Sequence, residues 1–184
     1  MIDQTEPAIH RVLEAASRKG VALEIRFLPV GTRNPGQVAA VVEAELGQIV
    51  KSVVFVSPRP AARLIPIVCL TSGCNEIDLA LLAAVTGEFA IRAATDREVL
   101  ELTGCAIDAA PPFGYGPEVR ILMDQDLCQY QWIWAATGTQ TAVFRVAPRT
   151  LRALANAVVA PIAAVRWMSS ASGAVAPGLT FGAG

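Results

Sequence analysis

Apolar residues in this chain recur with two different spacings, and each spacing predicts a different element. A spacing of three or four residues, as at Ile9, Val12, Leu13 and Ala16, is typical of a helix with one buried face. Alternation with a period of two is typical of a strand with one buried face. We therefore expect helices near residues 9–16, 35–46 (closed by Gly47), 78–85, 95–104 and from 148 onward, and strands over 22–28, 49–56, 64–70, 119–123, 132–136 and 142–146.

Short turns between the expected strands indicate antiparallel pairing. Residues 57–60 (Ser-Pro-Arg-Pro) predict a hairpin, and residues 137–140 (Thr-Gly-Thr-Gln) predict a turn before the last strand. Together with the helices, this favours an α+β fold whose mixed, largely antiparallel sheet is flanked by helices. We expect a single domain over residues 1–166 and a flexible C-terminal tail over 167–184, where Ser, Gly and Ala leave little to bury.

Lys51 stands in the middle of a strand that is otherwise almost entirely apolar. It is one of two lysines in a chain with thirteen arginines. Alternation places its side chain on the same face as Val53 and Phe55. Two interpretations are open at this point. The lysine stem covers apolar surface while its ammonium reaches water, or the ammonium serves a site that needs a compact point charge.

The cysteine and histidine residues limit which metal, disulfide and catalytic sites the chain can form. Cys69, Cys74, Cys105 and Cys128 contain no CxxC pair, and the single histidine, His10, lies far from them in sequence. We therefore expect no metal, no cofactor and no disulfide, and mostly buried, reduced thiols. A hydrolase built on a Ser-His or Cys-His pair would have only His10 available.

Charge and hydropathy bear on location and partners. The first six residues include acids and no basic segment, and no run of about 18 apolar residues is present, so we expect a cytoplasmic protein without a membrane partner. The formal net charge is −1, but no acidic residue follows Asp126, whereas Arg145, Arg149, Arg152 and Arg166 do. This distribution is compatible with a phosphate-contacting surface or with solvated arginines.

A segment rich in glycine and proline, residues 103–117, separates the fourth helix from the next strand, and ordered loops of this length are usually functional. Four features then occur in order: the Lys51 strand, Thr103-Gly104, Pro112-Phe113-Gly114 and the turn over residues 135–139. Over about residues 29–154 the chain resembles the YbaK/ProX family of aminoacyl-tRNA deacylases. The same fold is inserted as an editing domain in bacterial prolyl-tRNA synthetases.

The resemblance implies hydrolysis of the ester between a wrong amino acid and tRNA, without a metal and without a side-chain nucleophile. In this family a G-x-x-x-P loop presents backbone N–H groups to the ester carbonyl, and a lysine, here Lys51, holds a phosphate or the water network. The implied partner is the 3′ end of an aminoacyl-tRNA, with an aminoacyl-tRNA synthetase as a second candidate; the oligomeric state is left open. The implied catalytic positions are Lys51, Asp108, Ala109, Pro112 and Gly114, and the implied substrate-binding positions are Thr32, Thr103, Gly104, Phe113, Thr137 and Gly138.

The chain departs from the family pattern at Asp108, which stands where the family has the first glycine of the loop and is followed by Ala109. Loss of one oxyanion donor would slow the reaction by about 10²–10³-fold. Alternatively, Asp108 binds the substrate ammonium or acts as a general base. Our leading hypothesis is a trans-editing deacylase for a small amino acid mischarged on tRNA, with tRNA for proline as the expected substrate. The alternatives are a weakened member that binds aminoacyl-tRNA or a synthetase, and a thiol enzyme that uses Cys105.

Overall fold

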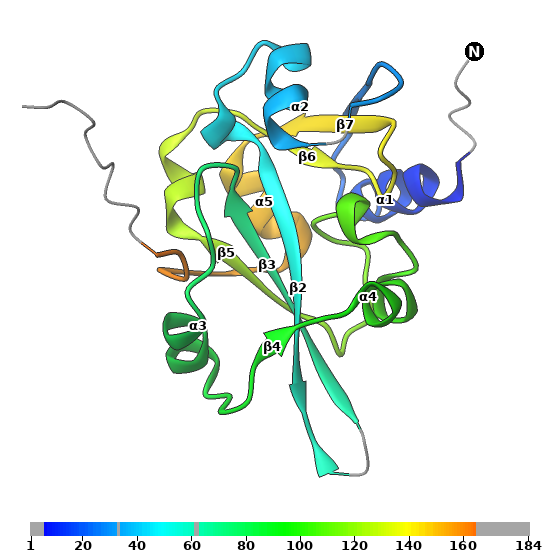
Figure 1. Ribbon diagram of the computed structural model, residues 1–184. Helices are drawn as coiled ribbons and strands as arrows, with labels where there is room; N and C mark the ends of the chain where they lie inside the picture. The colour runs from blue at the N-terminus through cyan, green and yellow to red at the C-terminus, as the bar shows by residue number, and fades with distance from the viewer. Residues whose placement is uncertain (1–5, 33, 61–62, 165–184) are drawn as a thin grey trace, which may run out of the picture.

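The computed structural model describes residues 6–32, 34–60 and 63–164 (Figure 1). In this part of the chain the helices are α1 (Pro7–Ser17), α2 (Pro35–Val42), α3 (Leu79–Thr86), α4 (Asp96–Thr103) and α5 (Pro148–Ala155), with short 3₁₀ helices η1 (Leu46–Gln48), η3 (Ile107–Ala109) and η4 (Gln125–Gln129). The strands are β1 (Glu24–Phe27), β2 (Val50–Pro58), β3 (Leu64–Ser72), β4 (Arg92–Ala93), β5 (Arg120–Asp124), β6 (Ile133–Ala136), β7 (Ala142–Val146) and β8 (Val158–Ala160).

The strands form two sheets. One sheet has the order β4-β2-β3-β5-β8 and the other has the order β1-β7-β6. The pairs β1–β7, β2–β3, β2–β4 and β6–β7 are antiparallel, whereas β3–β5 and β5–β8 are parallel. This arrangement confirms the expected α+β class with a mixed, largely antiparallel sheet. The predicted hairpin joins β2 and β3 and projects from the body of the molecule (Figure 1), but its turn begins after Pro58, because Ser57 and Pro58 are still paired with β3.

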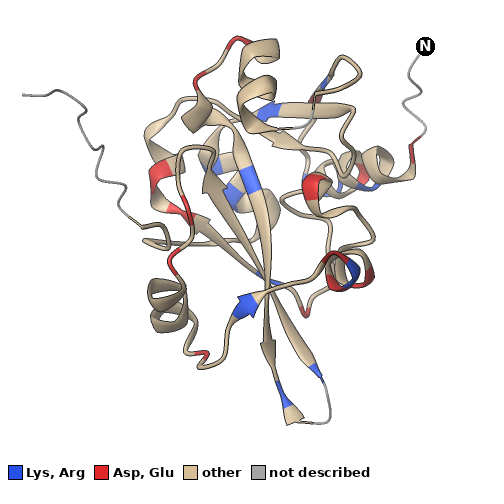
Figure 2. Ribbon diagram, viewed as in Figure 1, with Lys and Arg blue, Asp and Glu red and all other residues tan. Residues whose placement is uncertain are grey.

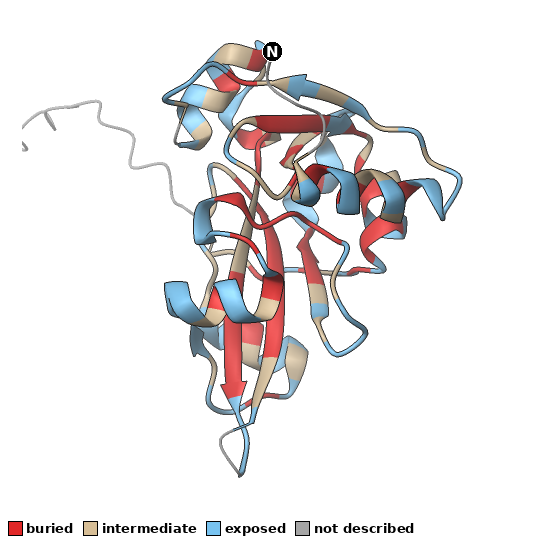
Figure 3. Cartoon of the chain, turned by 90° about the vertical axis from the view of Figure 1, so that its right-hand side faces the viewer, coloured by how far each residue is buried: buried red, intermediate tan, exposed pale blue. Residues whose placement is uncertain are grey.

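The main hydrophobic core lies between the two sheets and is closed by α1, α4 and α5. A smaller core lies on the opposite face of the five-stranded sheet, where Leu82 of α3 packs against Phe55, Ile67 and Leu122. A third cluster joins α2 to the outer face of the three-stranded sheet through Val143. In the large sheet, β2, β3 and β5 are accordingly buried along most of their length (Figure 3), whereas β4 is exposed. Because both faces are covered, these strands read in the sequence as nearly continuous apolar runs.

The alternation predicted for β2 is confirmed by the packing. Val50, Val54 and Val56 belong to the main core, and Phe55 belongs to the α3 side together with Val53. Lys51 therefore shares the α3 side of the sheet with Val53 and Phe55, at the end of the strand where the sheet meets the turn after β3.

Capping chemistry sets the helix ends. The predicted capping box of α4 is formed, since Thr95 Oγ1 accepts from the Glu98 N–H and the Glu98 carboxylate accepts from the Thr95 N–H. The expectation that the second helix extends to residue 46 is wrong. It ends at Val42 because Glu43 adopts the left-handed conformation, with a φ of 57°.

The structure also bears on the expectations for the cysteines, the C-terminal tail and membrane-spanning helices. Cys69 and Cys105 are buried, but Cys74 and Cys128 are exposed, so the expectation of mostly buried thiols holds for two of the four. The tail expected over 167–184 lies outside the described residues. Among the helices that are described, none combines the length and the apolar character required to cross a bilayer.

A buried carboxylate ties three segments together near the base of the β2–β3 hairpin. Glu88, which follows α3, is 5% exposed. Its carboxylate accepts a hydrogen bond from Ser57 Oγ at 2.7 Å and pairs with Arg59 and with Arg120, the latter at 3.0 Å. The hydrogen bond from Ser57, supported by Arg59 and Arg120, holds the pKa of Glu88 below its ordinary value of 4.5. The carboxylate therefore stabilises the folded state at neutral pH.

Replacing Glu88 by Gln should lower the free energy of unfolding at pH 7 by about 2 kcal/mol, because charge-assisted hydrogen bonds become neutral ones. The folded-state pKa is depressed, so this stabilisation is fully present above the ordinary pKa of 4.5 and is lost progressively as the pH falls from there through the lowered folded-state pKa. Urea denaturation at neutral pH and at about pH 3 measures the difference. Glu101→Gln, in the exposed Arg97–Glu101 pair, is the matched control. A Glu88→Gln deficit of equal size at both pH values would contradict a charge origin.

Candidate functional site

A cavity of about 320 Å³ lies beside the first half of β2. Its lining comes from residues 49–54, from residues 93–94, from η3 and its flank, and from the ends of β6 and β7, with Pro35 of α2 at its rim. Lys51 and Asp108, far apart in sequence, both line this cavity and are its charged residues; the other lining groups are mostly apolar. Two groups that the sequence analysis singled out are thus brought together.

The Lys51 ammonium is held by the turn that follows β3. Nζ donates to the Asn75 carbonyl oxygen at 2.6 Å and to Glu76 Oε1 at 3.1 Å. The Lys51 side chain is 20% exposed, whereas that of Glu76 is 68% exposed. An ion pair with so exposed a carboxylate contributes little, typically about 0–1 kcal/mol. The Asn75 carbonyl is therefore the contact that fixes the direction of the lysine.

A row of polar side chains across the end of the sheet supports this turn. Thr71 is the register partner of Lys51 and donates to Asp124 Oδ2 at 3.3 Å. Asn75 Nδ2 donates at 2.8 Å to the carboxylates of both Asp124 and Asp126. Asp124 is 1% exposed, and its burial raises the pKa of its carboxyl while the hydrogen bond from Asn75 opposes the shift. Asp124 was not among the residues predicted from the sequence; its signal was a carboxylate at the last position of a buried strand.

The loop around Asp108 is a turn of 3₁₀ helix, η3. The Ala109 N–H donates to the Ala106 carbonyl at 3.0 Å and is occupied within the turn. The N–H groups of Ile107 and Asp108 stand in the first turn, where a helix offers them no internal acceptor. Among the described non-glycine residues only Glu43 and Asn156 have a positive φ. Asp108 therefore occupies ordinary backbone space, and no glycine is required there for conformational reasons.

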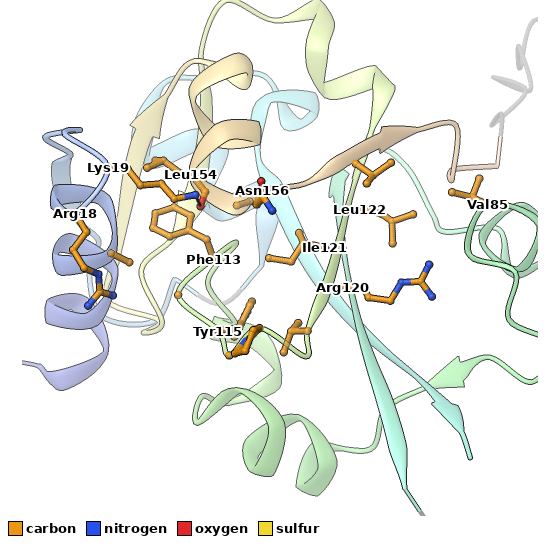
Figure 4. Close-up of a pocket in the computed structure, with 17 residues that line it drawn as sticks. Arg18, Lys19, Val85, Phe113, Tyr115, Arg120, Ile121, Leu122, Leu154 and Asn156 are labelled. Carbon is orange, nitrogen blue, oxygen red and sulfur yellow. Dashed lines mark hydrogen bonds between the residues drawn. The ribbon is translucent and has the colours of Figure 1, made fainter. Parts of the chain in front are cut away.

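Phe113 and Gly114 line a different, larger cavity of about 620 Å³ between α1, α5 and the 113–119 loop (Figure 4). Phe113 is 2% exposed, and its ring packs edge-on against Phe144 with ring centroids 5.8 Å apart. Pro112 is buried and lines neither cavity. Gly114 has a φ of 94° at the surface of the loop. These three positions shape the loop more than they line the Lys51 cavity.

The remaining predicted positions have local partners. Thr103 Oγ1 donates to the Val99 carbonyl and accepts from the Cys105 N–H, and Gly104 ends α4 with a φ of 68°. Thr137 is buried, and its hydroxyl donates to the Ala142 carbonyl. A side chain at Gly138 would collide with Ala8, because an added Cβ would lie 2.8 Å from the Ala8 Cβ.

Thr32 lies apart from the Lys51 cavity, and Trp134 in its lining was not predicted. The Thr32 hydroxyl donates to the Pro29 carbonyl in a surface turn before α2. Trp134, on β6, contributes an aromatic side chain to the lining. The signal for it was present, since Trp134 precedes the turn over residues 135–139 that carries the family resemblance.

Cys105 is close to a cation but poorly suited to nucleophilic work. Arg11 Nη2 donates to its sulfur at 3.4 Å. Burial nevertheless raises the pKa of the Cys105 thiol, and the charge of Arg11 offsets this only in part. A raised thiol pKa disfavours the reactive thiolate at neutral pH, which argues against the thiol-enzyme hypothesis.

Comparisons with known proteins identify the family of the chain. The family model of the aminoacyl-tRNA editing domain matches residues 30–154. A comparison with curated proteins finds no match. Among solved structures, the chain is similar to a candidate trans-editing enzyme for prolyl-tRNA synthetase, with 39% identity and a TM-score of 0.78 over 86% of this chain and 98% of the other.

Two further structures share the fold. One, from a study of epitope backbone grafting by computational design on scaffold proteins, is 34% identical, with a TM-score of 0.78 over 86% of this chain and 99% of the other. The second, a hypothetical protein, is 23% identical, with a TM-score of 0.75 over 84% of this chain and 99% of the other, and supports the fold alone. Since the family model spans more than half of the chain and includes both β2 and the Asp108 loop, the chain belongs to the family of YbaK-type aminoacyl-tRNA editing domains.

Proposed function

We propose that this protein is a cytoplasmic trans-editing deacylase that hydrolyses the ester between a small, mischarged amino acid and the 3′ end of tRNA, with tRNA for proline as its substrate. The observation that carries the proposal is the shared cavity: Lys51 and the Asp108 loop line one small, mostly apolar pocket in a member of the editing family. The choice of tRNA for proline is supported by the similar structure, which is itself described as a candidate trans-editing enzyme for prolyl-tRNA synthetase.

The cavity suits a reaction that depends on positioning. At about 320 Å³ it lies at the small end of ligand pockets, which favours a compact aminoacyl group. Water attacks the ester carbonyl, the carbonyl oxygen becomes an oxyanion, and collapse releases the amino acid and the tRNA hydroxyl. In this scheme the first-turn N–H groups of Ile107 and Asp108 are the donors offered to the oxyanion.

The Lys51 ammonium would hold the phosphate of the terminal adenosine or a water beside it. Its exposed partner Glu76 holds it weakly, so the ammonium can exchange that carboxylate for a phosphate or a water at little cost. The Asn75 carbonyl remains as the second partner and limits where the ammonium can move. A compact cation with three donors fits this exchange better than a planar guanidinium.

The second candidate function is a binding module with weak hydrolysis. It is favoured by one observation, the carboxylate of Asp108 in the cavity lining. Because the backbone at Asp108 is unstrained, any defect would arise from charge or bulk near the oxyanion rather than from a distorted loop.

Lys51→Ala should lower kcat/KM for deacylation by about tenfold or more, because a charge-assisted contact to the substrate is lost in both ground and transition states. The assay uses tRNA for proline charged in turn with alanine, cysteine, serine and threonine. Lys19→Ala is the matched control, since Lys19 is the other lysine and donates to the Ala153 and Leu154 carbonyls away from the cavity. Equal activity of the two variants would exclude Lys51 from the site. Absence of hydrolysis by the wild-type chain on every substrate would refute the deacylase.

Asp108→Gly should deacylate faster, by up to about 10²-fold, because removing a negative charge beside the developing oxyanion stabilises the transition state. Asp108→Asn separates charge from bulk: it keeps the size of the side chain and removes the charge, so it should share most of the gain. Single-turnover rates with saturating protein measure the chemical step. A slower Asp108→Gly variant would instead identify the carboxylate as a base or as the ligand of the substrate ammonium.

Asn75→Ala should release the Lys51 ammonium, because the turn that supplies its carbonyl partner loses its attachment to Asp124 and Asp126. With two lysines in the chain, acetylation followed by mass spectrometry reports the reactivity of Lys51 against Lys19 as an internal standard. We expect the ratio to rise several-fold in Asn75→Ala and to change little in Glu76→Gln, whose ion pair is exposed. A ratio unchanged by Asn75→Ala would show that the turn does not control the lysine.

A further inference from the structure

Arg149 and Arg152 of α5 are exposed, and neither side chain has a hydrogen-bond or ion-pair partner among the described residues. Most other described arginines are engaged, including Arg18 with Glu14 and Arg120 with Glu88 beside the second cavity. Figure 2 shows the basic residues of α5 and of the nearby end of β7. Two free guanidinium groups three residues apart on one helix form a surface with positive charge that nothing in the described protein neutralises.

These arginines border a groove of about 620 Å³ between α5 and the segment that joins η4 to β6. Tyr130 and Trp132 line the opposite wall, and Trp132 is 41% exposed. None of the lining residues is acidic. We call this feature the arginine groove. It combines unpaired guanidinium groups with an exposed aromatic ring, the combination that suits a nucleic-acid backbone and its bases.

A chain of contacts links the arginine groove to the Lys51 cavity. Trp134, which lines the cavity, is the register partner of Arg145 on β7. The Arg145 guanidinium lies over the Trp132 ring, 5.1 Å from its centroid, and Trp132 lines the groove. Arg145 also lies 3.8 Å from Glu24, but that carboxylate is 82% exposed and the pair is screened by solvent. Aromatic and basic side chains therefore continue from the cavity to the groove along one face of the small sheet.

We propose that the arginine groove binds the acceptor end of tRNA outside the cavity. Arg149 and Arg152 contact phosphates of the acceptor stem, and Trp132, with Arg145 on its other face, stacks on a base of the single-stranded 3′ end. The inference rests on the proposed function for the identity of the ligand. RNA is the occupant because guanidinium groups pair with phosphates and an exposed indole stacks on unpaired bases, whereas an acceptor-stem duplex offers its phosphates along the outside.

The test uses the full chain and a fluorescein-labelled RNA hairpin that carries no amino acid. The hairpin reproduces an acceptor stem with a single-stranded 3′ CCA end. Fluorescence anisotropy gives Kd at several salt concentrations between about 50 and 200 mM. R149Q/R152Q should weaken binding tenfold or more at the lowest salt and reduce the slope of log Kd against log salt by about 1.8, the value for two phosphate contacts. The control R63Q/R97Q removes the same charge from exposed positions elsewhere and should leave both quantities near those of the wild type.

Trp132 is tested with a second probe that lacks the single-stranded end. Trp132→Ala should bind the tailed hairpin about tenfold more weakly and the blunt hairpin as well as the wild type does, while Trp132→Phe keeps most of the affinity. Equal losses on both probes would overturn the stacking assignment. Equal binding by R149Q/R152Q and R63Q/R97Q would overturn the groove. The groove would also be overturned as an RNA site if R149Q/R152Q binds RNA normally and loses only a complex with prolyl-tRNA synthetase.

The two proposals fail separately, because the binding probe carries no ester. If the wild type deacylates tRNA and R149Q/R152Q binds RNA normally, the deacylase stands and the groove does not. If the wild type binds the hairpin through the groove and hydrolyses none of the charged tRNAs, the groove stands and the deacylase does not.

Discussion

The buried carboxylate of Asp124 is the constraint on which the candidate site depends. A carboxylate with 1% exposure is costly unless its oxygens are hydrogen-bonded, and here the donors are Thr71 on the adjacent strand and Asn75 in the turn beyond it. Meeting this requirement fixes the Asn75 turn against the end of the sheet. The turn in turn offers its carbonyl to Lys51. The position of the Lys51 ammonium, which we propose contacts the substrate, therefore follows from the hydrogen-bond requirement of Asp124, a residue that would never touch the substrate.

The pleat of β2 adds a second constraint. Neighbouring residues point to opposite faces, so Val50 and Val54 enter the main core while Lys51 turns toward the α3 side. The cavity lies at the edge of the same strand and is contacted from both faces. A lysine has the length and flexibility to reach round such an edge, and its exposed partner Glu76 holds it loosely. The fold thus keeps the Lys51 ammonium ordered through the Asn75 carbonyl while its contact with Glu76 can be exchanged for another.

Elements with a strong period or cap could be predicted from the sequence, and pairings between distant segments could not. The β2–β3 hairpin and the α4 capping box depend on residues adjacent in the chain, and both are present as predicted. The end of α2 could not be read, because Glu43 gives no sequence signal for a left-handed conformation. The two-residue β4 and the three-residue β8 are set by the strands they pair with rather than by their own patterns. For the site, the sequence indicated Lys51 and the Asp108 loop, but the Asp124–Asn75 contact joins residues 49 positions apart and needed the fold.

In the proposals made above, the arginine groove would set the affinity for tRNA and Asp108 would set the rate of hydrolysis. The groove lies outside the cavity, so contacts there would be made equally before and during ester cleavage, and would change affinity without changing the rate of the bound complex. Asp108 lines the cavity with ordinary backbone geometry, so its carboxylate would act on the charge that develops at the carbonyl and would change the rate with little effect on affinity. If Asp108 stands in place of the family glycine, as we propose, the exchange would leave the arginine groove unchanged and would alter only the hydrolytic step. Under this proposal the chain would bind tRNA equally well whether Asp108 slows or supports hydrolysis, and so binding of tRNA alone does not distinguish the deacylase from the binding module.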